Sequence, residues 1–496
     1  MGPRAVNILH YRILVNASGT SKERLVSELR WSRRTAGILG LGILLPSILL
    51  GQAPHKVLPD SGGCLGCGST RHFGAAASEL LTFELIPYSY NRWIWKVPFG
   101  QTTWHSWSEN LSHGWVWDTD HFPVNQLAHP YSGNLYFNSA RSHGYDFWSA
   151  APFAFAGSLL WEYFGETTRP SINDLMNTTL GGITLGETTY RLSNLILDRR
   201  TTGLTRIFRE IGAALVDPPL ALTRLTDGDI GRVEANYSDR EPPRMAQAMG
   251  LGYQLVSQGS AQSPLTQPHQ TFLQYSLSYG DPLHGDVTHP FGAFRLAGTL
   301  ATGTNGTVSQ LDAIGYLGAH DFLRTETRNQ QLQFTINYHY LNNRAVLSGG
   351  QGLSGVYISR YSLGRSMTIR GEASLIGYLI DGVKSDFNPD PQALQNETAR
   401  NYDYGMGGGG RVVARFQRNG HDLLQAAYQD SWIGVLSGAA RDHRFDVLSG
   451  RIEVPIIGPF ALGGSALLYH RTSRYPTHET VHAQDARTQI YAAVLY

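Results

Sequence analysis

Four side chains in the first half of the chain are of the types that carry acid–base chemistry: His129, Glu162, Glu166 and Asp174. Glu162 and Glu166 are four residues apart, so on a helix both would lie on one face. Two carboxylates at such a short distance destabilise each other unless a cation, a proton or an arginine lies between them. Such a set could act as acid and base on a phospholipid or lipopolysaccharide ester, or bind a divalent metal. These four residues are therefore the candidate catalytic residues.

The same region also contains the residues of a structural polar network, which is the interpretation we favour. Its members are two arginines, a serine, an asparagine and a third glutamate: Arg141, Ser158, Asn173, Glu187 and Arg191. Arg141, Arg169 or Arg191 could neutralise the paired glutamates, and Ser158 could be drawn as a triad with His129 and Asp174. The sequence contains no HExxH zinc helix and no GxSxG elbow. We assign no metal ligands, and the sequence identifies no cofactor.

Helices must position these residues, and the segment from about Glu79 to Leu225 has the patterns for them. Ser171 is a good N-cap, because its hydroxyl can accept a free backbone N–H. Gly157, Gly181, Gly182 and Gly186 are most simply helix-packing and cap positions. The expected helices are Val124–Ala140, Ala154–Phe164, Ile172–Thr179, Thr188–Leu197 and Leu204–Leu215, the last stopped by Asp217-Pro218-Pro219.

Tryptophan is concentrated in this region: eight of the ten tryptophans lie between Trp93 and Trp161, six of them between Trp93 and Trp117. Indole is favoured where one side is apolar and the other hydrated, so this density fits a segment at a membrane–water boundary. A tight soluble core is the alternative.

The stretches from Asn125-Gln126 to Arg141 and from Trp161 to Arg191 resemble a family of uncharacterised bacterial proteins that carry a domain of unknown function and are predicted for the outer membrane. The resemblance covers roughly Pro87–Asn194. It implies a helical module ahead of a barrel, and it implies no established activity and no catalytic residues.

A second resemblance rests on an acid…Asp…Asn…Gly…Gly pattern, which is similar to that of VanZ-like membrane proteins. The matching residues are Glu162 or Glu166, Asp174, Asn177, Gly181 and Gly186. The helices around them are less apolar than that family requires.

The second half of the chain alternates between apolar and polar residues. In the segment 331–340, the apolar residues Leu332, Phe334 and Ile336 lie on one face of the expected strand. The polar residues Gln333 and Thr335 lie on its other face. A strand that is apolar outside and polar inside is what a lipid-embedded barrel needs. Twelve segments qualify, although ten or fourteen strands remain possible: 248–257, 270–280, 291–301, 306–317, 330–340, 353–361, 366–380, 404–418, 421–431, 443–454, 459–471 and 486–496. Arg295, Arg370, Arg411, Arg415 and Glu372 would face inward as ordinary polar filling.

The start of the chain indicates export. Arg33 and Arg34 precede an uncharged run from Thr35 to Ala53, which reads as a secretory signal with a misassigned start, or alternatively as a membrane anchor. Cys64 and Cys67 form a CxxC followed by Gly68, for which a local disulfide or an idle pair is the simplest interpretation.

The composition also fits an exported membrane barrel, because only 16% of the 496 residues are charged, 55 are glycine and 11% are aromatic. A formal net charge of +1 gives no reason to expect nucleic acid. We expect an α+β chain: signal 1–53, linker 54–78, Trp-rich helical module 79–225, junction 226–247, and an antiparallel transmembrane barrel of about twelve strands at 248–496.

Three functions compete for this outer-membrane protein. The first is a structural, accessory or envelope-assembly role, with the module packed against or inside the barrel. The second is a lipid- or lipopolysaccharide-modifying hydrolase that uses His129, Glu162, Glu166 and Asp174, and the third is a narrow channel or transporter plugged by the helices. The expected partners are outer-membrane lipid and the barrel-assembly machinery, which would recognise the last strand ending at Tyr496.

Overall fold

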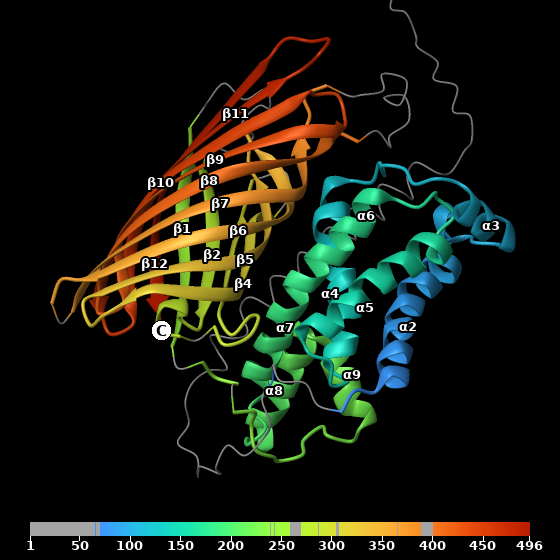
Figure 1. Cartoon of the computed structure of the whole chain (residues 1–496), viewed down its shortest axis with the longest axis horizontal. Helices are drawn as coiled ribbons and strands as arrows, with labels where there is room; N and C mark the ends of the chain where they lie inside the picture. The colour runs from blue at the N-terminus through green and yellow to red at the C-terminus, as the bar shows by residue number, and fades with distance from the viewer. Residues whose placement is uncertain are drawn as a thin grey trace, which may run out of the picture.

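A computed structural model describes Leu65 and residues 70–238, 240–242, 244–257, 269–285, 287–303, 307–364, 366–387 and 400–496. The expected signal, the cysteine pair and most of the expected linker lie outside these residues. Within them the chain forms two parts side by side, a helical module and a barrel (Figure 1).

The helical module runs from Phe73 to Thr226. Its α-helices are α2 (Phe73–Ser89), α3 (Trp104–Ser112), α4 (His129–Arg141), α5 (Phe147–Leu160), α6 (Ile172–Met176), α7 (Gly182–Leu197), α8 (Gly203–Val216) and α9 (Pro218–Thr226). Four π-helical turns extend or join them: η1 (Tyr90–Ile94), η3 (Val124–Ala128), η4 (Trp161–Gly165) and η5 (Asn177–Gly181), while η2 (Pro98–Gly100) is a short 3-10 turn. In the described residues, no helix combines the length and apolarity needed to cross a membrane.

All five expected helices are present, with differences at their ends. The second starts earlier, at Phe147, because the Asp146 carboxylate accepts the backbone N–H of Ser149 (2.9 Å) and caps it. Ser171 caps α6 as expected. Asp217-Pro218-Pro219 stops α8 and also starts α9, since proline fits the first helical turn and Asp217 accepts the N–H of Leu220. Helix α2 was not expected, and it begins inside the segment read as linker.

Glycines let the central helices touch. A Cβ on Gly133 of α4 would lie 1.8 Å from the Thr178 carbonyl oxygen, and one on Gly182 would lie 2.4 Å from the Gly133 backbone. Farther along the same crossing, Gly186 leaves room for the ring of Phe137. Helices α4 and α7 therefore pack backbone against backbone, as close helix pairs with small residues do. This crossing forms the centre of the module.

The second half forms a closed antiparallel barrel of twelve strands in sequential order, β1 pairing with β12. The strands are β1 (Met245–Val256), β2 (His269–Tyr279), β3 (Phe294–Ala301), β4 (Val308–Arg324), β5 (Arg328–Asn342), β6 (Leu347–Ser362), β7 (Met367–Lys384), β8 (Tyr402–Arg418), β9 (His421–Ser437), β10 (Asp442–Ile457), β11 (Phe460–Arg474) and β12 (Val481–Leu495), with the 3-10 turn η6 (Pro282–His284) after β2. The predicted fold class is confirmed, at twelve strands. Tyr496 completes the closure through two backbone hydrogen bonds with Gln247.

Polar side chains of the barrel itself cross the lumen. Glu372 of β7 accepts hydrogen bonds from Arg295 of β3 across the interior (3.1 Å) and from Arg415, and it forms an ion pair with Arg370. Nearer one end, Arg471 of β11 donates to the carbonyl oxygen of Ala345 (2.7 Å), in the turn between β5 and β6. Four of the five residues expected to face inward, Arg295, Arg370, Arg415 and Glu372, therefore form ion pairs.

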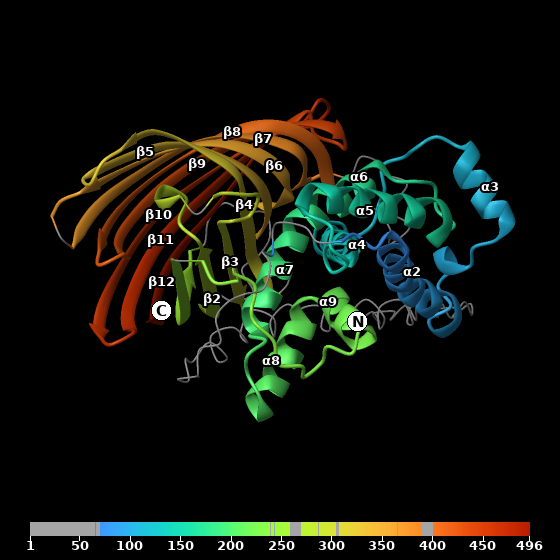
Figure 2. The ribbon, with the colours of Figure 1, turned by 60° about the horizontal axis from the view of Figure 1, so that its bottom comes forward.

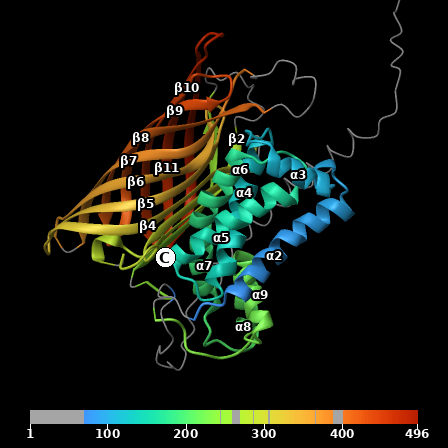
Figure 3. The ribbon, with the colours of Figure 1, turned by 45° about the vertical axis from the view of Figure 1, so that its right-hand side comes forward.

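The module lies against the outer wall of the barrel, and its helices do not enter the lumen (Figures 2 and 3). On β5, Gln331, Gln333 and Thr335 face inward, so Ile336 and Tyr338 face outward with Phe334. Phe334 is exposed, but Ile336 and Tyr338 are buried by the helices. The same covering extends to outward-facing residues of other strands: Tyr275, Leu277, Tyr279, Leu311, Tyr402 and Tyr404. Of the two placements expected for the module, against the barrel or inside it, the structure shows the first, because apolar residues on the outer wall provide the packing surface.

Candidate functional site

The polar residues of the module separate into two groups. In the first, Glu187 at the centre of α7 accepts Arg141 Nε (2.7 Å) and Arg191 Nε (2.9 Å), and all three side chains are buried. Arg141 also donates to the carbonyl oxygens of Tyr145 and Leu65. Arg141, Glu187 and Arg191 thus form a buried ion network.

The second group, here called the acid cluster, consists of Asp118, His129, Glu162, Glu166 and Asp174. Its parts are held together by a short backbone bridge, in which Val116 N donates to Pro170 O and Ile172 N donates to Val116 O (both 2.9 Å). Three of the π-helical turns supply or adjoin its residues: η3 precedes His129, η4 contains Glu162, and η5 follows Asp174. Such turns occur often at functional sites.

Hydrogen bonds within the acid cluster run through the segment from Ser171 to Asp174. The Glu162 carboxyl accepts the backbone N–H of Ser171 (2.6 Å). The imidazole of His129 places Nε2 3.5 Å from Asp174 Oδ1 and Nδ1 3.2 Å from the Thr178 hydroxyl. The amide of Asn173 donates to Asp174 (2.8 Å). His129, Glu162 and Asp174 are therefore brought to one place, with the 171–174 segment between the histidine and Glu162.

Several details of the sequence-based picture were wrong. Glu166 does not share a helix face with Glu162, because η4 ends at Gly165 and the Glu166 backbone is extended. No arginine neutralises the pair: Arg141 and Arg191 bind Glu187, while Arg169 donates to the Gly114 carbonyl oxygen. Ser158 forms no triad, since its buried hydroxyl has no hydrogen-bond partner among the described residues.

Burial without arginine partners shifts the pKa of four members of the acid cluster. Desolvation, together with the smaller effect of the charges of Glu166 and Asp174, raises the pKa of Glu162 to about 10. Desolvation likewise raises the pKa of Asp174 and of Glu166 well above their ordinary values. Burial lowers the pKa of His129, although Asp120 and Asp118 oppose this shift. At neutral pH Glu162 therefore holds a proton.

The acid cluster lies where the module meets the barrel, along a seam of amide and phenol groups. Asn125 donates to the Tyr402 hydroxyl (2.5 Å), while Asn173 and Asn177 donate to the Tyr404 hydroxyl (3.4 and 3.2 Å). The side-chain oxygens of Asn125 and Asn177 are buried and have no partner among the described residues. The described residues contain no group of three or more His, Cys, Asp or Glu side chains disposed to hold a metal ion.

Sequence reasoning missed the barrel's part in this site. Tyr402 and Tyr404 lie more than 200 residues from the helices they bind, and on their strand they look like ordinary lipid-facing tyrosines. Asp118 was also missed, although Asp118 and Asp120 come directly after the tryptophan-rich segment. The asparagines of the seam did carry a signal: Asn173 in the expected polar network, Asn125 in the family-like stretch, and Asn177 in the VanZ-like pattern.

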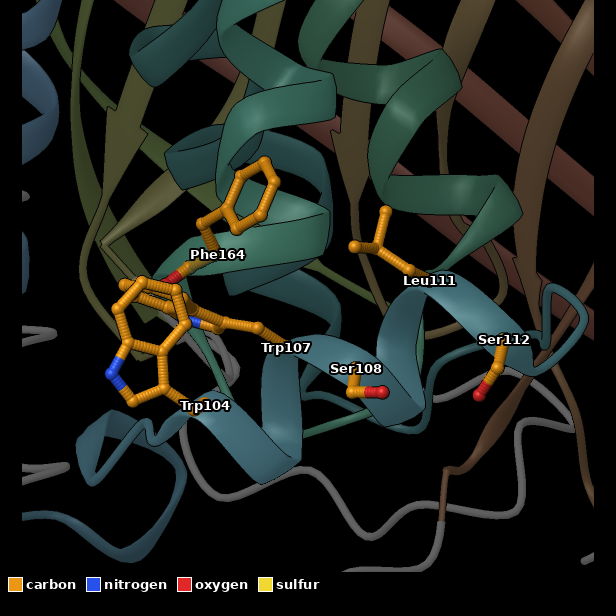
Figure 4. A pocket seen from close by; sticks show the side chains of 6 residues that line it. All are labelled: Trp104, Trp107, Ser108, Leu111, Ser112 and Phe164. Carbon is orange, nitrogen blue, oxygen red and sulfur yellow. The ribbon is translucent and has the colours of Figure 1, made fainter.

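A separate surface hollow of about 370 Å³ lies on the module near α3 (Figure 4). Trp104, Trp107, Leu111 and Phe164 give it an apolar lining, with Ser108 and Ser112 at its edge. The Trp107 indole N–H donates to the Phe164 carbonyl oxygen (3.0 Å), so this ring is fixed, whereas Trp104 is exposed. The hollow contains no member of the acid cluster.

Comparison with solved structures returns membrane barrels at low similarity. The chain is similar to the NanC porin, with 7% identity over 49% of this chain and 98% of that chain and a TM-score of 0.24. It is also similar to the CymD monoaromatic hydrocarbon channel, with 7% identity over 52% of this chain and 90% of that chain and a TM-score of 0.21. A third similar structure is BamA from Haemophilus ducreyi lacking POTRA domains 1–3, with 9% identity over 46% of this chain and 42% of that chain and a TM-score of 0.22. Among curated proteins, none matches the chain significantly.

The module has a clearer relative. Residues 114–219 match the model of DUF3943, a domain of unknown function. The matched segment contains the acid cluster, the Glu187 ion network and the glycine crossing of α4 with α7. This chain thus combines a helical segment that matches DUF3943 with a twelve-stranded barrel.

Proposed function

We propose that this is an outer-membrane protein with a structural or accessory role in the envelope, in which the barrel anchors the DUF3943 module. The observation that carries the proposal is the seam. Tyr338, Tyr402 and Tyr404 of the wall all hydrogen-bond to the module, and Arg400 donates to the Asp118 carbonyl oxygen (3.1 Å). Because one side of the barrel wall is covered by the module and hydrogen-bonds to it, the barrel acts as a support for the module.

The side chains that cross the lumen favour an anchor over a channel. The Glu372 group and Arg471 cross the interior, and Arg471 also binds Asp386 (2.7 Å). A barrel of this size can be filled by its own side chains. The barrel-assembly machinery would recognise the last strand before insertion is complete, because Tyr496 pairs with Gln247 in the closed barrel.

Conductance of the full chain in planar bilayers tests the anchor against the channel. We expect no regular current steps from the refolded protein. Steps of uniform size that disappear when the protein is omitted would overturn the proposal and favour the transport alternative.

A loss-of-function experiment tests the accessory role itself. Deleting the gene should increase the sensitivity of the cells to detergent and to large antibiotics, and the wild-type chain should restore the barrier. A double variant with Tyr402→Phe and Tyr404→Phe, which weakens the seam, should restore it incompletely at equal expression. Full restoration by this variant would contradict the importance of the seam.

A second candidate function, a lipid-modifying hydrolase, is favoured by one specific feature. The Asp174 carboxyl lies 3.5 Å from the His129 imidazole, and a carboxyl and an imidazole in contact can supply a general acid and a general base. Incubating the full chain with labelled outer-membrane phospholipid and lipopolysaccharide tests this function. Turnover that is lost in Glu162→Gln would establish it, while no turnover with equally folded proteins would leave the acid cluster structural.

A further inference from the structure

The module has its polar residues inside and many apolar residues outside. On α8, five apolar residues with helical spacing are 39–72% exposed: Leu204, Ile207, Phe208, Ile211 and Leu215. The charged residues of the same helix turn inward, where Arg209 donates to the Ile196 carbonyl oxygen (2.8 Å) and Arg206 pairs with Glu210. A surface helix of a water-soluble domain has the opposite arrangement.

Helix α2 repeats this reversal. Its two glutamates, Glu79 and Glu84, are buried, and Glu79 accepts the hydroxyl of Thr223 (2.7 Å). Its exposed large apolar residues include Leu81, Leu85 and Ile86. Figure 3 places α2 on the side of the module away from the barrel, so the wall does not cover this face.

Helix α5 and the segment before it add large aromatic rings to the exposed surface. From Phe147 to Leu160, α5 has no charged residue, and Trp148 and Phe155 are exposed. Trp93 and Trp104 are exposed as well. Exposed apolar surface on this scale marks a contact with another apolar phase or partner.

The barrel indicates which phase this is. Its free outer wall presents apolar side chains, among them Leu375, Val412 and Ile490. This apolar belt continues directly to the border of the module: Phe334 is exposed two residues from buried Ile336, and Met406 is exposed two residues from buried Tyr404. Hydrocarbon that surrounds the belt would therefore meet the flank of the module at the same depth.

We propose that the helical module is itself immersed in the outer-membrane bilayer, with the exposed faces of α2, α5 and α8 in contact with lipid hydrocarbon. The contact is lateral, beside the barrel, and requires no helix to span the membrane. Amphipathic helices bind bilayers through such faces. The inference rests on the outer-membrane location of the barrel proposed above.

Spin labels can test the contact without disturbing the core. In the full chain with Cys64→Ser and Cys67→Ser, single cysteines are placed at Ile207 and Ile211 of α8 and labelled with a nitroxide. The chain is refolded into phosphatidylcholine–phosphatidylglycerol vesicles, and folding of the barrel is verified by its heat-dependent gel mobility. Leu375→Cys on the free wall is the lipid reference, and Arg232→Cys, on an exposed charged side chain, is the water reference.

We expect the α8 labels to collide with oxygen and to be protected from a water-soluble nickel complex, with an accessibility ratio near that of Leu375→Cys and several-fold above that of Arg232→Cys. Ratios equal to the water reference would overturn the inference while leaving the barrel in the membrane. Protection from both reagents would also overturn it, because a second protein would then cover α8. A Leu375 label accessible to nickel would overturn both this inference and the membrane location of the barrel.

Discussion

The ion network around Glu187 and the acid cluster around Glu162 lie in the same helical module and are both buried, yet they handle charge in opposite ways. Glu187 is held by two guanidinium groups within hydrogen-bond distance. Glu162 has a backbone N–H and other acids as neighbours, and burial raises its pKa to about 10. A buried glutamate side chain is thus stable either as a carboxylate paired with arginine or as a protonated acid.

This difference separates a structural role from a chemical one. Removing a partner from a buried ion pair leaves an uncompensated charge. We therefore expect that the loss of any member of the Glu187 network destabilises the fold of the module. The acid cluster has exchangeable protons and unpartnered amide oxygens beside the barrel wall. If the module performs chemistry, the acid cluster is the region equipped for it.

The largest expected effect comes from breaking the ion network. Glu187→Gln leaves Arg141 and Arg191 without their carboxylate, and we expect the module to lose about 3–5 kcal/mol of unfolding free energy. Urea unfolding followed by tryptophan fluorescence measures this loss, since eight of the ten tryptophans lie between Trp93 and Trp161. The exposed pair Arg444–Asp430 provides the control, because Asp430→Asn should cost less than about 1 kcal/mol. Equal costs would contradict the structural role.

The glycine crossing should give the next largest effect. In Gly133→Ala the new methyl group meets the Thr178 carbonyl oxygen, so α4 and α7 must separate, at a cost of about 2–3 kcal/mol. In Gly74→Ala, on α2, the methyl group meets nothing within 4 Å, and the variant should gain about 0.5–1 kcal/mol. Opposite signs in the same unfolding assay are the expected result, and a neutral Gly133→Ala would argue against the close crossing.

A smaller effect is expected at the seam. Tyr404→Phe removes the acceptor shared by Asn173 and Asn177, and leaving buried amides unpaired should cost about 1–2 kcal/mol. The barrel should keep its heat-dependent gel mobility while the tryptophan transition moves to lower urea. Tyr428→Phe, on the exposed wall of β9, should leave both unchanged. If the two variants behave alike, Tyr404 does not hold the module.

The smallest effect at neutral pH should come from the acid cluster. Glu162→Gln replaces a protonated acid by a neutral side chain of the same shape, so its cost at pH 6 should be below about 1 kcal/mol. The raised pKa of Glu162 means that the folded state binds the extra proton, so wild-type stability should fall as pH rises from about 4.5 to about 10. Glu162→Gln should flatten this decline and be more stable than wild type at pH 9. An unchanged pH profile would show that Glu162 does not hold the proton.

The barrel was predictable in detail because its signal is local. A period of two assigns every residue of β5 to the lumen or to the outer wall, and the twelve predicted strands overlap β1–β12. Even β10, whose alternation is poor, was expected within a few residues of its ends. The composition and the alternation alone therefore indicated a barrel of about this size.

The candidate site was only partly predictable, since it depends on contacts between distant segments. His129, Glu162 and Asp174 were identified by residue type, and they do lie together. The absence of arginine around them was not foreseen, because Arg141 is nearer in sequence to Glu162 than to Glu187, the residue that it binds. Partner choice among buried charges is decided by packing, here by the glycine crossing that places α7 beside α4.

By itself, the sequence determined the α+β class, the order of module and barrel, the strand rhythm and the residues able to exchange protons. These features depend on periodicity and side-chain chemistry, which act over a few residues. Only the tertiary structure decided that the module packs outside the barrel, that Tyr402 and Tyr404 join the site, and which acids lack an arginine. An outward-facing tyrosine has the same pattern whether lipid or a helix covers it, so local sequence cannot distinguish the two.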